Sequence, residues 1–102
     1  MRDIERLATH IKDEIDDAEE YIREAMDTDN KETADLYCTL AGEELRHMNM
    51  LHDRVVGEIE EWRDRTGQEP PPEMQARYDI LHKIYAGEAN KVRLLIQLYK
   101  EG

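Results

Sequence analysis

The stretch Thr28-Asp29-Asn30-Lys31-Glu32 decides the fold, because it interrupts a helical pattern that covers most of the first two thirds of the chain. Before it, apolar residues at helical spacing predict a helix over residues 2–27. After it, the same spacing predicts a second helix that ends near Arg65, with Gly67 as its C-terminal cap. So short a turn makes the two helices an antiparallel hairpin.

Two details of this hairpin follow from single residues. Asp29 and Glu32 have the spacing of a capping box, with Asp in place of the usual Ser or Thr, so we expect Asp29 to begin the second helix. The apolar stripe of the first helix is Ile4, Leu7, Ala8, Ile11, Ile15, Ala18, Ile22 and Ala25. That of the second is Ala34, Tyr37, Leu40, Ala41, Met48, Leu51, Val55, Ile59 and Trp62.

A proline-rich segment follows the hairpin. Residues 67–72, Gly67-Gln68-Glu69-Pro70-Pro71-Pro72, cannot continue a helix, although the last proline can begin one. We therefore divide the chain into a helical hairpin (1–66), a linker (67–72) and a C-terminal helix (73–102). The expected stripe of this third helix is Ile80, Leu81, Ile84, Ala89, Val92, Leu95, Leu98 and Tyr99. Strand patterns are absent, so the fold class is all-α.

Length and charge narrow the function. The chain has 102 residues and 25 acidic against 14 basic side chains, a net charge of −11, which makes nucleic acid a poor partner. No apolar run is long enough for a membrane helix or signal peptide, and the single Cys38 forms no internal disulfide, so we expect a cytoplasmic protein. Helices this long in so small a chain favour a homo-oligomer, which closes the core.

Three polar residues interrupt the apolar stripes. Glu14 lies on or beside the stripe of the first helix, and Glu44 and His47 lie one turn apart on that of the second. Glu14 and Glu44 are each 15 residues from Asp29, so both stand roughly 22 Å from the turn. Burying an unpaired carboxylate is costly, so such a group is neutralised, is paired or binds a metal. Oxygen and nitrogen ligands without a thiolate suit iron, manganese or zinc.

The same residues carry a resemblance to a known family. Glu14, Tyr21 and the run Glu44-Leu45-Arg46-His47 resemble the ligand pattern of the ferritin-like superfamily, over roughly residues 7–62. The short turn and the single ligand set resemble most closely the half-ferritin subunits called encapsulated ferritins. Di-iron carboxylate bundles use one Glu from each of two helices and a Glu-x-x-His from each of the other two, which two copies of this hairpin supply.

The resemblance implies a function. Two subunits, as a dimer or a multiple of dimers, would assemble four-helix bundles and hold two irons in a shared site. Glu14, Glu44 and His47 would bind the metal, with Glu44 bridging, and Tyr21 would lie beside it. The site would act as a ferroxidase, oxidising Fe(II) to Fe(III) with dioxygen for iron storage or detoxification, and an encapsulin-type shell is a possible partner and nanocompartment.

Other interpretations remain open. The protein is alternatively a non-enzymatic acidic oligomerisation or adaptor module, or a di-metal protein with another oxidative role. His10, one turn from Glu14, is either a further ligand or a solvated side chain. Asp79 and His82 repeat the ligand spacing on the third helix, where exposed polar residues are the simpler explanation.

Overall fold

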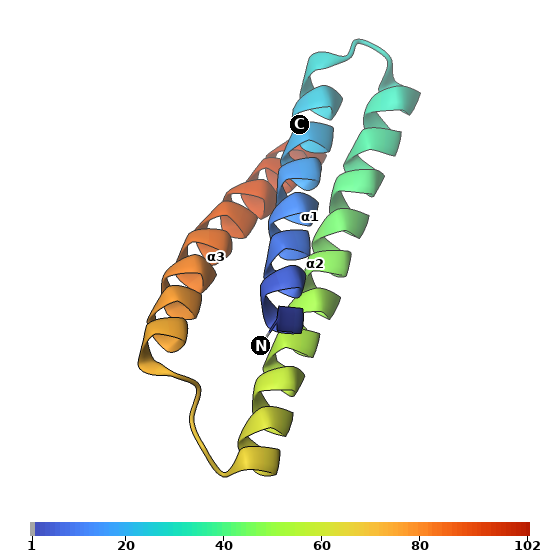
Figure 1. Ribbon diagram of the computed structural model, residues 1–102. Helices are drawn as coiled ribbons and strands as arrows, with labels where there is room; N and C mark the ends of the chain where they lie inside the picture. Colours follow the sequence, from blue (N-terminus) through green and yellow to red (C-terminus); the bar gives the residue numbers. More distant parts are fainter. Residues whose placement is uncertain (1) are drawn as a thin grey trace.

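The computed structural model describes residues 2–102 as three α-helices. They are α1 (Arg2–Asp27), α2 (Lys31–Thr66) and α3 (Pro72–Glu101), and there is no strand within residues 2–102. Figure 1 shows α1 and α2 side by side as an antiparallel hairpin, with α3 crossing on one side of it. The molecule is a rod of 55 × 19 × 19 Å. The expected all-α class and the three-helix order are confirmed.

The core lies mainly between α1 and α2. Ile15, Ile22 and Val55 are among its largest fully buried side chains, and Cys38 is packed among them as a free thiol. The alternation of apolar and charged residues on α1 places one face inside and the other in water, which is how an amphipathic helix gains stability from burial. Leu45, which the expected stripe omits, also belongs to the core.

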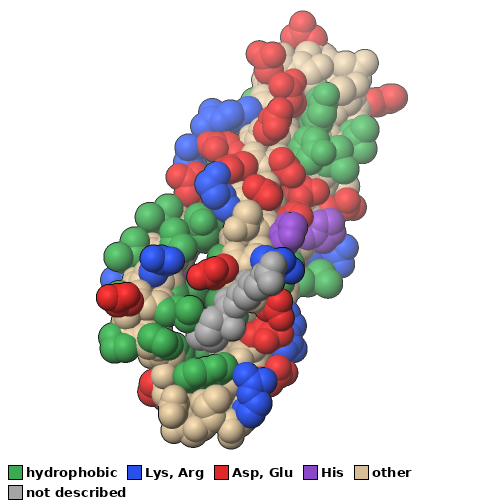
Figure 2. Space-filling view, in the orientation of Figure 1, with side chains coloured by type: hydrophobic (Ala, Val, Ile, Leu, Met, Phe, Trp, Pro, Cys, Tyr) green, Lys and Arg blue, Asp and Glu red, His purple; other side chains and the backbone are tan. Residues whose placement is uncertain are grey.

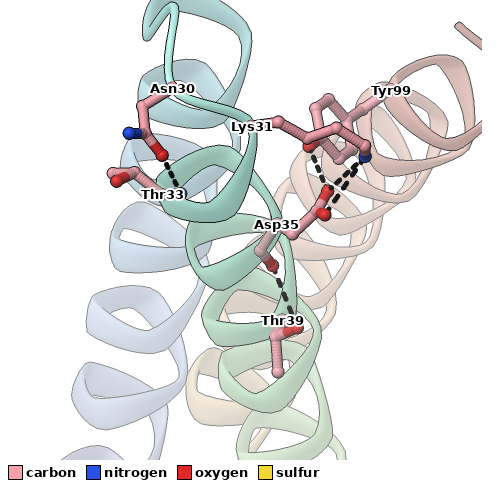
Figure 3. Close-up of polar contacts among 6 residues, drawn as sticks. All are labelled: Asn30, Lys31, Thr33, Asp35, Thr39 and Tyr99. Carbon is pink, nitrogen blue, oxygen red and sulfur yellow. Dashed lines mark hydrogen bonds and ion pairs between the residues drawn. The ribbon is translucent and has the colours of Figure 1, made fainter.

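The N-terminal cap of α2 is Asn30, so the prediction of Asp29 was wrong. The Asn30 side-chain oxygen accepts a hydrogen bond from the Thr33 backbone N–H at 2.9 Å (Figure 3). An N-cap side chain bonds the backbone N–H two or three residues into the helix, and Asn fills this role as well as Asp. The chain therefore enters α2 one residue later than the capping-box spacing suggests.

The C-terminal cap of α2 is Gly67, as predicted. Its φ of 66° is left-handed, and its N–H donates to the Arg63 carbonyl. Glycine has no Cβ to clash in this conformation, which is why it so often ends a helix. The prolines that follow turn the chain back, and Pro72 begins α3.

Helix α3 packs mainly on α1. Lys91 Nζ lies 2.6 Å from Glu19 Oε1 of α1, and the Tyr99 hydroxyl donates to Asp35 of α2 at 2.6 Å (Figure 3). Val92 and Ala89 are its buried residues. A cavity of about 180 Å³ lies between α3 and the hairpin, with Tyr78, His82 and Tyr85 in its wall.

The expected stripe of α3 was partly wrong. Ile80, Ile84 and Leu98 were assigned to the core, yet all three are exposed. Tyr78, Tyr85 and Ile96 pack against the core in their place. Within the described residues, no helix is both long and apolar enough to cross a membrane.

Candidate metal centre

The hairpin brings together the three polar residues that interrupt its apolar stripes. Glu14 comes from the middle of α1, and Glu44 and His47 come from one turn of α2. One ligand atom of each lies within 4.8 Å of the others. The equal distance of Glu14 and Glu44 from the turn therefore does place them side by side, because both helices run regularly from that turn.

The group is partly enclosed and open on one side. His47 Nδ1 lies 3.6 Å from Glu14 Oε2 and 4.0 Å from Glu44 Oε1. The side chains of Glu14 and Glu44 are 25% and 19% exposed, against 44% for His47. The two carboxylates are thus partly enclosed, and the imidazole is the most exposed of the three side chains.

Glu44 is held in an environment that disfavours its charged form. Hydrogen bonding with the Glu14 carboxyl group is the largest cause that raises the pKa of Glu44 to about 7. Partial burial and the negative charges of Glu14, Asp17 and Glu43 act in the same direction. Two neighbouring carboxyl groups cannot both ionise cheaply, so without a cation this pair retains a proton near neutral pH.

The residues fit a divalent metal ion. Glu14 Oε2 is buried and accepts no hydrogen bond from any residue between 2 and 102. A buried oxygen without a donor is rare, because its desolvation is then uncompensated. Two carboxylates and one imidazole form a hard oxygen and nitrogen donor set, which suits iron, manganese or zinc. A cation at this point would compensate the buried Glu14 oxygen and would displace the proton from Glu44.

Two further residues were expected near the site. Tyr21 stacks on Tyr37 of α2, with ring centroids 6.1 Å apart. Within residues 2–102, Tyr21 forms no hydrogen bond with the metal-ligand candidates of the site. His10 is exposed and stands outside the group.

The structure also shows a contact between two histidines that the sequence did not predict. His52 Nε2 of α2 and His82 Nε2 of α3 are 3.0 Å apart, and Tyr78 stacks on His82. Asp79 does not join His82 but accepts a hydrogen bond from Gln75. No spacing within one helix signals a contact that depends on how α3 crosses the hairpin.

Comparison with family models, with curated proteins and with solved structures finds no match to this chain. The ferritin-like resemblance therefore rests on the pattern of residues alone.

Proposed function

We propose that this protein binds Fe(II) between two subunits and oxidises it to Fe(III) with dioxygen. The observation that carries the proposal is the convergence of Glu14, Glu44 and His47, with one buried carboxylate oxygen that lacks a donor. Three protein ligands would leave coordination positions open for dioxygen.

The shared site follows from ligand number and charge. One chain offers two carboxylates and one imidazole, which is half of the set found in di-iron carboxylate bundles. A two-fold axis through the open side of the hairpin doubles this to four carboxylates and two imidazoles. Four carboxylates balance the charge of two divalent ions, so the doubled set would be neutral when it holds two metals.

The reaction needs little from the protein beyond binding. Two Fe(II) ions would together give two electrons to one dioxygen, which takes up two protons from water and leaves as hydrogen peroxide, and the hard anionic ligands would favour the Fe(III) product. Glu14 and Glu44 hold the cations, and His47 terminates the set on the solvent side. Glu44 gives up its proton when a cation binds, so binding releases protons to solvent below about pH 7.

The surface favours a cationic substrate. The chain carries a net charge of −11, and Figure 2 shows acidic side chains spread over α1 and α2 around the visible histidines. A negative surface raises the local concentration of Fe(II) and its rate of encounter. We place the protein in iron storage or detoxification, in the cytoplasm or inside a protein nanocompartment.

Anaerobic Fe(II) titration followed by oxygen uptake tests the proposal. Wild-type protein should bind about one iron per chain, as expected for a di-iron site shared by two subunits, and then consume oxygen as ferric absorbance appears. Glu44→Ala and His47→Ala should lose stoichiometric binding while keeping their helicity. Glu43→Ala, which removes an exposed carboxylate one residue away, is the matched control and should behave as wild type.

Three results would contradict the proposal. Iron binding that survives in both site variants would show that the ions bind elsewhere. Binding without oxygen uptake would favour a di-metal protein with another oxidative role, and no binding at all would favour the acidic adaptor module.

A further inference from the structure

We propose that the outer face of α3 is a self-association surface, on which α3 of a second copy of this chain packs antiparallel. This surface, here called the α3 seam, consists of Arg77, Ile80, Ile84, Gly87, Lys91, Leu94, Leu98 and Glu101. It is separate from the Glu14, Glu44 and His47 group, and the proposal does not depend on iron binding.

The α3 seam is apolar and uncovered. Ile80, Ile84, Leu94 and Leu98 are 60%, 52%, 55% and 50% exposed, and they are half of all the large exposed hydrophobic residues of the described chain. Figure 2 shows hydrophobic side chains gathered on the side of the molecule that α3 forms. The opposite face of α3, with Ala89 and Val92, is already buried against the hairpin. Helix α3 therefore has two apolar faces and uses only one of them within the chain.

The spacing of the α3 seam is that of a coiled coil. Its members alternate by three and four residues over the whole length from Arg77 to Glu101. A repeat of this kind keeps one stripe facing a partner helix, and the inner residues of α3 that pack on the hairpin follow the same repeat: Tyr85, Ala89, Val92, Ile96 and Tyr99. The occupant that this spacing fits is another helix with the same repeat.

The α3 seam is also symmetric about the level of Ala89. Ile80 and Leu98 stand nine residues on either side of that level, and Ile84 and Leu94 stand five. Two antiparallel copies related by a two-fold axis at this level place Ile80 opposite Leu98 and Ile84 opposite Leu94. Every large apolar residue of the seam then meets another, which is the self-complementarity that a two-fold interface requires.

Charge selects the antiparallel arrangement. In the same register Arg77 stands opposite Glu101 at both ends, and Lys91 stands opposite Gly87, which has open space where a Cβ would lie. Lys91 is in addition neutralised by Glu19 at 2.6 Å. A parallel pair would instead set Arg77, Lys91 and Glu101 each against its own copy, and like charges in a helix interface are unfavourable.

This surface and the proposed metal interface lie on different helices. No polar contact in residues 2–102 joins α3 to Glu14, Glu44 or His47, which contact one another across α1 and α2 only. A chain with two separate two-fold surfaces binds two neighbours, so assembly continues beyond a dimer.

Sedimentation analysis in the presence of a chelator tests the surface without the metal interface. Wild-type protein should be dimeric, and Ile84→Glu and Leu94→Glu should be monomeric with unchanged helicity, because both side chains are solvent-exposed in the single chain. Asn90→Glu adds the same charge to an exposed position of α3 outside the seam, and it should remain dimeric. A wild-type monomer, or dissociation caused equally by Asn90→Glu, would overturn the proposal.

Disulfide trapping in a Cys38→Ala background tests the register. Ile84→Cys and Leu94→Cys chains should cross-link to each other when they are mixed, and neither should cross-link alone. In the antiparallel register residue 84 is ten residues, about 15 Å, from its own copy, which is beyond the reach of a disulfide. Cross-linking of Ile84→Cys to itself, or no cross-linking in the mixture, would overturn the antiparallel arrangement. Because the metal is absent throughout, these results are independent of whether the protein oxidises iron.

Discussion

The folded chain favours the protonated form of Glu44, and a cation bound beside it would favour the charged form. Its carboxyl group faces that of Glu14 in a partly enclosed position, which raises its pKa to about 7. Binding sites often contain a group with a shifted pKa that lowers the stability of the ligand-free protein. The environment of Glu44 therefore has measurable consequences even in metal-free protein.

Stability of the metal-free protein should fall as the pH rises from about 4.3 to about 7. The pKa of Glu44 is about 7 in the folded chain, against about 4.3 for an ordinary glutamate, so between these values the folded state holds a proton that the unfolded state has released. Stability from this proton is complete below the lower pKa and lost above the higher one.

Glu44→Gln should remove this part of the pH dependence, because an amide does not ionise. In chelator at pH 8 we expect the variant to be more stable than wild type by about 1–2 kcal/mol, as its amide retains a hydrogen bond without the charge. Urea unfolding at several pH values measures the difference, with Glu43→Gln as the control. If the variant is no more stable than wild type at pH 8, then Glu14 does not destabilise the charged form of Glu44.

The regularity of α1 and α2 made the position of the site predictable from the sequence. The residue at which α2 begins was predicted less well. Counting residues from the turn placed Glu14 beside Glu44 because α1 and α2 are uninterrupted between the turn and the site. The capping-box spacing of Glu32 favours Asp29 as the cap. Asp29 and the adjacent Asn30 are equally good N-cap residues, and only the backbone conformation distinguishes them. Asn30 has the extended conformation that an N-cap needs.

Asn30→Ala should lower the free energy of unfolding by about 1 kcal/mol, because it removes the side-chain acceptor for the Thr33 N–H. Asp29→Ala is the matched control and should cost only a few tenths of a kcal/mol, through the lost charge near the start of α2. Chemical denaturation of both variants provides the comparison. A larger loss of unfolding free energy for Asp29→Ala than for Asn30→Ala would show that Asp29 is the N-cap.

The end of α2 gives a second paired test. Gly67→Ala should destabilise the protein by about 1 kcal/mol, because a Cβ is strained at a φ of 66°. Gly57→Ala lies inside α2, where a new Cβ meets only the flexible Arg54 side chain at 3.5 Å, and it should stabilise by about 0.5–1 kcal/mol. Thermal unfolding distinguishes the two signs, and equal effects would contradict the capping geometry.

The packing of helix α3 on the hairpin could not be predicted from its sequence. Its apolar residues were assigned to one stripe, but they form two, and Ile80, Ile84 and Leu98 belong to the outer one. Periodicity alone does not say which of two apolar faces meets the hairpin. The crossing of α3 is fixed by contacts such as Tyr99 with Asp35 and Lys91 with Glu19, and these residues are far apart in sequence.

For the whole molecule, the account depends on association. A three-helix rod with a partly enclosed carboxylate pair and an uncovered apolar seam is incomplete as a single chain. In the assembly that we propose, two copies joined at the open side of the hairpin would complete the donor set, and the α3 seam would join such pairs to one another. The net charge of −11 on each chain would oppose association through the rest of the surface.

Native mass spectrometry of anaerobically Fe(II)-loaded protein tests the shared metal site most directly, because it reports subunit number and bound iron together. We predict even-numbered assemblies in which irons occur in pairs, one for each subunit, and no bound iron in Glu44→Ala or His47→Ala. Iron on single subunits, or iron retained by both variants, would contradict a site built from two copies of Glu14, Glu44 and His47.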